Sequence, residues 1–96
     1  MEIDWRLLGL RMHDIRMQRR ISLRRLMAMT GYSDSHLCNI ERNHCHASLE
    51  NLVAIVSALD VSLDYIVRGI RPQSGTSGLV FHSDDELEEI LFLTEE

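Results

Sequence analysis

The sequence predicts an all-α fold, a compact bundle of five helices followed by a C-terminal extension. Three observations lead to this prediction. Apolar residues recur at spacings of three and four over most of residues 4–69. A serine or an aspartate stands before each of these runs, where it can cap the first turn of a helix. The single proline, Pro72, follows all of them, so no proline interrupts the bundle.

The first two helices are expected over residues 4–19 and 22–30. Asp4 is the predicted N-cap of the first helix, whose inner face carries Leu8, Met12 and Ile15. Ser22 is the predicted N-cap of the second helix. Gly31 is expected to end it, because glycine adopts the positive φ of a C-terminal cap without strain.

A third helix is expected from Ser33 to about Arg42, directly after the turn at Gly31-Tyr32. It is predicted to share one buried seam with the second helix, made of Leu26, Met29, Leu37 and Ile40. Two short helices joined by such a turn, with a polar outer face on the second, form the unit that places a helix in the DNA major groove. The pattern therefore predicts that residues 33–42 face DNA.

Two further helices complete the predicted bundle. Ser48 is the expected cap of the fourth, and its predicted apolar stripe consists of Leu49, Leu52, Val53, Val56 and Leu59. Ser62 is the expected cap of the fifth helix, which Gly69 ends. The DNA-binding domain is accordingly assigned to residues 1–70.

Residues 71–78 are interpreted as a flexible linker, because serine and glycine dominate them. Residues 79–96 follow as an acidic segment. Its S-x-x-E pattern at Ser83 predicts a capping box and a short amphipathic helix, while Val80 and Phe81 fit either a short strand or a hydrophobic staple. Three roles stay open for this helix: self-association into a dimer through Leu87, Ile90 and Leu91, which we favour, folding back on its own domain, or docking a second protein.

The distribution of charge favours a nucleic-acid partner despite a net charge of −5. Residues 1–71 contain all ten arginines and eight acids, whereas residues 72–96 contain seven acids and no basic residue. A basic domain with an acidic appendage is typical of nucleic-acid binders, although acidic tails also serve solubility. No signal peptide or membrane-spanning run is visible, and two cysteines make no disulfide framework, so we expect a cytoplasmic protein.

Chemistry at a metal or a nucleophile is not expected. Cys38, His44, Cys45 and His46 are ligand types for zinc or copper(I). Their spacing lacks a CxxC pair, and adjacent residues cannot all turn toward one ion, so we assign no metal and no cofactor. A Cys/His pair without an oxyanion site or phosphate-binding loop does not indicate an enzyme.

Residues 8–69 resemble the Cro/C1-type helix-turn-helix family of phage-repressor-like DNA-binding domains. The resemblance lies in three segments that occur in the family's order and spacing: LGLRMHDIR, ISLRRLMAMTGYSDSHLCNIERN and SLENLVAIVSALDVSLDYIVRG. It implies a lambda-repressor-like fold and a role in reading double-stranded DNA.

The resemblance also implies individual roles. The positions that commonly face base edges are Asp34, Ser35 and Asn39, and those near the DNA backbone are Ser33, His36 and Arg42. Arg24 is a separate candidate for a backbone contact, as an arginine of the first two helices. Arg16 and Glu41 match a pair that joins the first helix to the third. Other arginines of the first two helices are further candidates for backbone contacts: Arg11, Arg19, Arg20 and Arg25.

Three residues depart from the family pattern. Leu23 stands where a glutamine often bonds a phosphate and braces the third helix, and Asn43 and Ala47 replace a usual glycine and proline. Asp34 is unusual at a base-facing position, where it either accepts from a cytosine amino group or serves as a helix N-terminal charge.

These observations predict a sequence-specific DNA-binding transcriptional regulator, a repressor that acts as a homodimer on a palindromic operator. The alternative is an antitoxin-like or anti-regulator module that grips a partner protein through the acidic tail.

Overall fold

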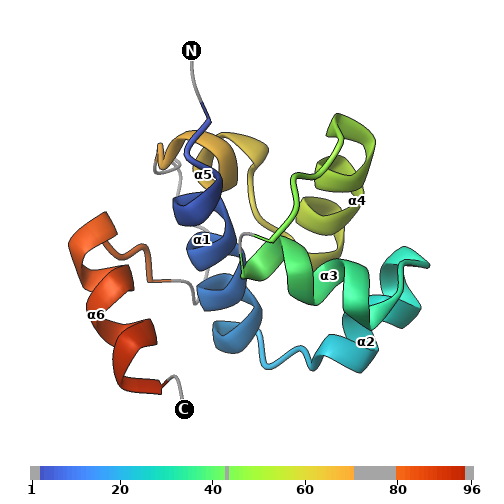
Figure 1. The fold of residues 1–96 in the computed structure, drawn as a ribbon, viewed down its shortest axis with the longest axis horizontal. Helices are drawn as coiled ribbons and strands as arrows, with labels where there is room; N and C mark the ends of the chain where they lie inside the picture. Colours follow the sequence, from blue (N-terminus) through green and yellow to red (C-terminus); the bar gives the residue numbers. More distant parts are fainter. Residues whose placement is uncertain (1–2, 43, 71–79, 95–96) are drawn as a thin grey trace.

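The computed structural model describes residues 3–42, 44–70 and 80–94, and within these ranges the protein is helical and contains no strand. The all-α prediction is confirmed for this part of the chain. The helices are α1 (Trp5–Gln18), α2 (Leu23–Thr30), α3 (Asp34–Glu41), α4 (Leu49–Leu59), α5 (Leu63–Arg68) and α6 (Asp84–Thr94) (Figure 1). The predicted linker at 71–78 lies outside the described residues, as do Asn43 and the side chains of residues 90–94.

The helices begin where the sequence predicts. Five N-cap side chains each accept a hydrogen bond from the backbone N–H three residues ahead: Asp4, Ser22, Ser33, Ser48 and Ser62. At α6 the capping box is reciprocal: the Ser83 amide donates to Glu86 Oε1 (2.9 Å) and the Glu86 amide donates to Ser83 Oγ (3.3 Å). These bonds satisfy N–H groups that have no partner inside the helix.

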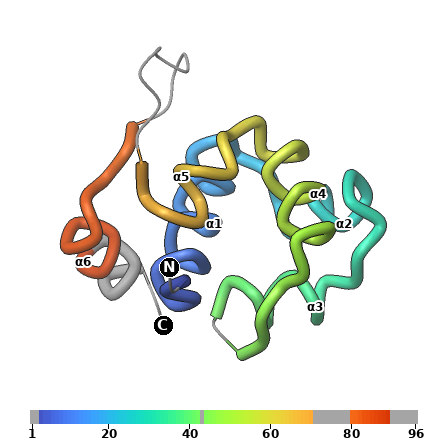
Figure 2. The backbone as a smooth tube through the Cα atoms, turned by 90° about the horizontal axis from the view of Figure 1, so that it is seen from above, coloured from blue at the N-terminus to red at the C-terminus, as the bar shows by residue number. Residues whose placement is uncertain are grey.

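Helix α1 is the central element of the bundle and packs against α3, α5 and α6, while α2 packs against α3 and α4 (Figure 2). The core is apolar, and its fully buried members include Leu8, Met12, Ile15, Leu26, Leu37, Ile55, Leu59 and Ile66. Burial of this apolar surface is the main source of the bundle's stability. None of the helices described here has the length and apolar composition needed to cross a membrane.

Three residues assigned to apolar seams are in fact exposed. Met29 is 47% exposed, and Leu49 and Val53 are 68% and 46% exposed. The cause is helix phase: the buried side of α2 is centred between Leu26 and Met27, and three residues beyond Leu26 the helix has turned Met29 away from it. In α4, the side that faces the core carries Leu52, Val56 and Leu59, as predicted, together with Ile55, which the predicted stripe omitted.

Helix α6 lies beside α1, on the side away from α3 and α4 (Figures 1 and 2). Leu87 is completely buried there, and the segment before it is held by polar contacts. The Gln18 side-chain amide donates to the Val80 carbonyl (2.7 Å) and accepts from the Val80 N–H (2.8 Å). Nearby, His82 Nδ1 lies 3.1 Å from the Asp14 carboxylate. Of the three roles left open for this segment, the described residues show it folded back on its own domain.

Candidate nucleic-acid interface

The turn between α2 and α3 sets the direction of α3. Gly31 has φ +82°, and its N–H donates to the Met27 carbonyl at 2.8 Å. An added Cβ would meet no atom within 4 Å, so glycine is required by the left-handed backbone and not by lack of space. Ser33 then caps α3 through its hydroxyl oxygen, which accepts from the His36 N–H (3.1 Å). The hydroxyl hydrogen remains a donor for another group.

Helix α3 buries one side and exposes the other. Leu37 and Ile40 face the core, whereas Asp34 and Ser35 are exposed and Asn39 is half-buried. These are the three residues predicted to face bases, and they stand on the accessible side of the helix. The exposed first turn offers a carboxylate and a hydroxyl, groups that can read base edges by hydrogen bonding.

The residues predicted near the DNA backbone occupy positions of different accessibility. Arg42 is exposed at the C-cap of α3, and Arg24 is exposed in the first turn of α2. Arg11, in contrast, is 5% exposed, and its guanidinium donates to the Ile66 carbonyl and to Asp84. The candidate role of Arg11 at DNA is therefore wrong, because its donors are used to hold α5 and α6 on α1. Arg19 likewise donates to the carbonyls of residues 59 and 60.

An ion pair joins α1 to the end of α3. Arg16 Nε donates to Glu41 Oε2 at 2.8 Å, and a second guanidinium nitrogen donates to Glu41 Oε1 at 3.2 Å. The two side chains are 11% and 7% exposed. A bidentate arrangement fixes the angle between two helices more tightly than a single contact, so this pair orients α3 on the bundle.

The sequence did not predict that His13 also contacts Glu41. His13 Nδ1 lies 2.7 Å from Glu41 Oε1. Burial raises the pKa of Glu41, but the hydrogen bonds to His13 and Arg16 and the positive charge of Arg16 outweigh burial and hold the pKa below its ordinary value of 4.5. Glu41 therefore stays ionised at neutral pH, with its carboxylate held against His13 and Arg16.

Gly9 is a second residue that sequence reasoning missed. A Cβ at this position would lie 2.5 Å from the Glu41 carbonyl oxygen and 2.9 Å from that of Ile40. Only glycine lets α1 approach the last turn of α3 this closely. A glycine inside a predicted helix was the one available signal, because glycine weakens a helix and its presence calls for a packing reason.

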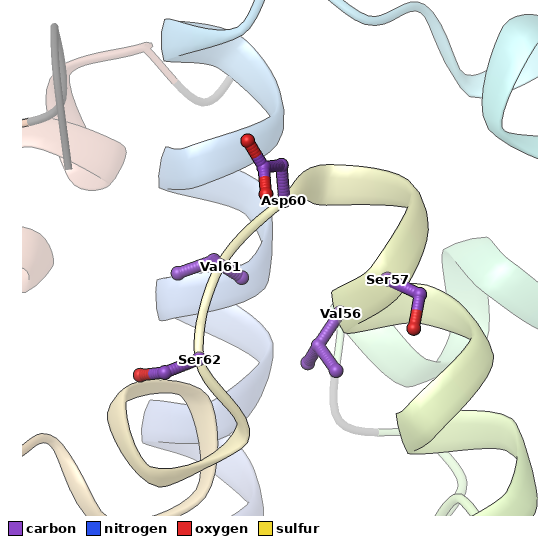
Figure 3. Close-up of a pocket in the computed structure, with 5 residues that line it drawn as sticks. All are labelled: Val56, Ser57, Asp60, Val61 and Ser62. Atoms are coloured by element: carbon purple, nitrogen blue, oxygen red, sulfur yellow. The ribbon is translucent and has the colours of Figure 1, made fainter.

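The loop after α3 does not assemble a metal-binding group. Among the described residues, no three His, Cys, Asp or Glu side chains gather closely enough to hold an ion. His46 stacks on Trp5 instead, with ring centroids 4.2 Å apart. A small depression between α4 and α5 is lined by Val56, Ser57, Asp60, Val61 and Ser62 (Figure 3). Asp60 is the one ionisable group in that lining, so the depression offers no acid–base pair.

Of the three residues predicted to make a dimer interface, only Leu87 has a side chain within the described structure. Leu87 is enclosed by its own chain and is not accessible to a second copy in this arrangement. Ile90 and Leu91 belong to α6, but their side chains lie outside the described residues.

Two short helices, joined by a left-handed turn at a glycine and with a polar outer side on the second helix, define a helix-turn-helix protein. The sequence pattern of the helix-turn-helix family matches residues 12–66, more than half of the chain. The chain belongs to this family, in its Cro/C1 type, whose members are repressor-like DNA-binding transcription regulators.

Solved structures support this assignment. The P22 c2 repressor in complex with a synthetic operator is 33% identical, with a TM-score of 0.63 over 67% of this chain and 97% of that one. The DNA-binding domain of the P22 c2 repressor in solution is 30% identical, with a TM-score of 0.65 over 75% and 95%. The restriction-modification controller protein C.AhdI from Aeromonas hydrophila is 25% identical, with a TM-score of 0.63 over 66% and 96%. No match was found among curated proteins.

Proposed function

We propose that this chain is a sequence-specific regulator that binds double-stranded DNA as a homodimer on a palindromic operator and represses transcription. The observation that carries the proposal is the geometry of α3. The Arg16–Glu41 pair fixes one end of this helix, and its outer side leaves Asp34 and Ser35 accessible. A helix that is rigidly held and polar on its outer side suits the major groove of DNA. The P22 c2 repressor, with the same fold, has been solved on an operator.

The base-facing and backbone-facing roles are part of this proposal. Asp34, Ser35 and Asn39 would contact base edges, while Ser33, His36, Arg42 and Arg24 would contact phosphates. Ser33 keeps its hydroxyl hydrogen free of its capping bond, and the two arginines are exposed. Arginine donates bidentate bonds to phosphate oxygens, which suits both positions.

The homodimer follows from the small footprint of a single α3. One recognition helix contacts few base pairs, whereas two copies read half-sites about 34 Å apart and gain specificity from both. The acidic tail gives less support to this dimer than the sequence predicted, because Leu87 already packs in its own domain. The same contact gives less support to the alternative function, a module that captures a partner protein through the tail.

Selection from a randomised DNA library at two salt concentrations tests the proposal. The expected result is one enriched palindrome at both concentrations, because two symmetric copies read two inverted half-sites. Binding that disappears at the higher salt concentration and enriches no sequence would contradict it, since such binding is purely electrostatic. Co-purification of a second protein dependent on residues 79–96 would favour the interaction module.

A further inference from the structure

A side-chain contact of His36 joins α3 to α4. His36, in the first turn of α3, lies with its Nε2 atom 2.9 Å from the side-chain nitrogen Nδ2 of Asn51 in α4. The rings of Tyr32 and His36 also lie edge to face, with a centroid distance of 5.6 Å and an interplanar angle of 74°. The imidazole thus contacts two residues.

The contact with Asn51 determines which ring nitrogen of His36 carries hydrogen. The amide nitrogen of asparagine only donates, so Nε2 has to accept. A neutral imidazole has one acceptor and one donor, and its hydrogen is then on Nδ1. Among the described residues, Nδ1 of His36 has no hydrogen-bond partner. The side chain is half-buried, and polar groups in such places normally have a partner.

Asn51 is itself well anchored. It stands in the first turn of α4, where its backbone N–H donates to the capping hydroxyl of Ser48 at 3.2 Å. The cap fixes the backbone from which the Asn51 side chain extends. The amide therefore approaches His36 from a defined position.

We propose that Asn51 is a positioning residue that holds His36 in its Nδ1–H form, so that α3 presents a neutral N–H donor to a phosphate oxygen of the DNA backbone. This inference rests on the proposed function and makes it more specific. The phosphate is the favoured acceptor because His36 and Ser33 both stand at the start of α3, where the His36 backbone N–H donates to the Ser33 hydroxyl, and N–H and O–H donors at this end of the helix suit the DNA backbone. The contact is a hydrogen bond to a neutral ring and requires no protonated histidine.

Nuclear magnetic resonance of the full chain tests the positioning role without DNA. In protein labelled with ¹⁵N at histidine, long-range proton–nitrogen correlations distinguish the two neutral forms of His36. We expect hydrogen on Nδ1 in the wild type. Asn51→Asp keeps the size of the side chain but replaces the donor with an acceptor, so it is expected to move the hydrogen to Nε2. Hydrogen on Nε2 in the wild type, or an unchanged form in Asn51→Asp, would overturn the proposal.

A double-mutant cycle on the selected operator tests the contact with DNA. His36→Ala and Asn51→Ala are each expected to weaken binding about fivefold, the size of one lost hydrogen bond. The double variant should bind as weakly as either single variant, because both remove the same contact. Multiplicative losses, or wild-type affinity in Asn51→Ala, would contradict the proposal.

A control variant and a replacement variant distinguish failure of the proposal from a general loss of folding or binding. Val53→Ala, on the exposed side of the same helix, is expected to bind like the wild type. If Asn51→Ala does not fold, Asn51→Leu takes its place in the cycle, because it keeps the size of the side chain, removes the amide donor and adds no charge near the DNA backbone. If the wild type selects no operator, the proposed function fails, whereas the resonance experiment still decides the form of His36.

Discussion

A Cβ atom placed on Gly9 would lie 2.5 Å from the carbonyl oxygen of Glu41, closer than Cβ atoms come to such an atom in real proteins. Helix α1 therefore touches the last turn of α3 directly. The same turn carries the Glu41 carboxylate that Arg16 holds. The orientation of α3 thus depends on a close backbone contact and an ion pair at one place.

Gly9→Ala is expected to destabilise the domain by about 1–3 kcal/mol, the usual cost of overpacking. The loss occurs even though alanine favours a helix by about 1 kcal/mol over glycine, because the added methyl group meets rigid carbonyl groups. Urea denaturation measures the change. Met17→Ala, at a position of α1 that is 58% exposed, is the control and should change stability little. A Gly9→Ala protein as stable as the wild type would show that α1 and α3 separate without cost.

Glu41→Gln is expected to reduce stability by about 3 kcal/mol at neutral pH, because it leaves the nearly buried Arg16 without its carboxylate. The change should also alter the pH dependence. The pKa of Glu41 is lower in the folded state than its ordinary value of 4.5, so its stabilising effect is present above that value and is lost as the pH falls through the folded pKa.

Denaturation of both proteins at several pH values measures this effect. The wild type should lose more stability than Glu41→Gln as the pH is lowered below 4.5. Equal losses in the two proteins would mean that Glu41 titrates alike in the folded and unfolded chains.

Leu87→Ala is expected to cost about 2–5 kcal/mol, as is usual for a buried leucine, because Leu87 has no exposed surface. The loss should be the same at low and high protein concentration if the side chain packs in its own domain. A loss that depends on concentration would place Leu87 between two copies, as the sequence predicted. Val80→Ala, 59% exposed, is the control for a change in the same segment. Thermal melts at two concentrations distinguish the cases.

The sequence was sufficient to locate the helices because their starts depend on local interactions. A capping serine needs only the amide three residues ahead, so Ser22 and Ser33 could be identified without knowledge of the fold. The exposed side of α3 followed from helical periodicity in the same way.

Contacts between distant residues could not be predicted in this way. The burial of Leu87 depends on where α6 lies, and periodicity shows that a helix has an apolar side without showing what covers it. His36 and Asn51 are 15 residues apart in the sequence, and each alone reads as an ordinary polar residue. Met29 was misassigned for a related reason, since an eight-residue helix gives too few apolar positions to fix its phase.

Asn39→Ala is expected to relax the base preference at one position of each half-site while most of the affinity is kept. A lost base contact removes discrimination of about 1–3 kcal/mol at that base pair and leaves phosphate contacts unchanged. Repeating the library selection with the variant measures the change. Recovery of the wild-type operator with equal stringency at every position would argue against a base-reading role for Asn39.

Arg42→Ala is expected to weaken binding to all sequences and to lower the dependence of affinity on salt. Arg42 is exposed at the end of α3, and one lost phosphate contact reduces the slope of log affinity against log salt by about 1. Arg6→Ala is the matched control, because it removes the same charge from a residue that pairs with Glu88 in α6. Titrations at several salt concentrations give both slopes. If Arg6→Ala and Arg42→Ala change the slope equally, the effect of Arg42 comes from net charge and not from a phosphate contact.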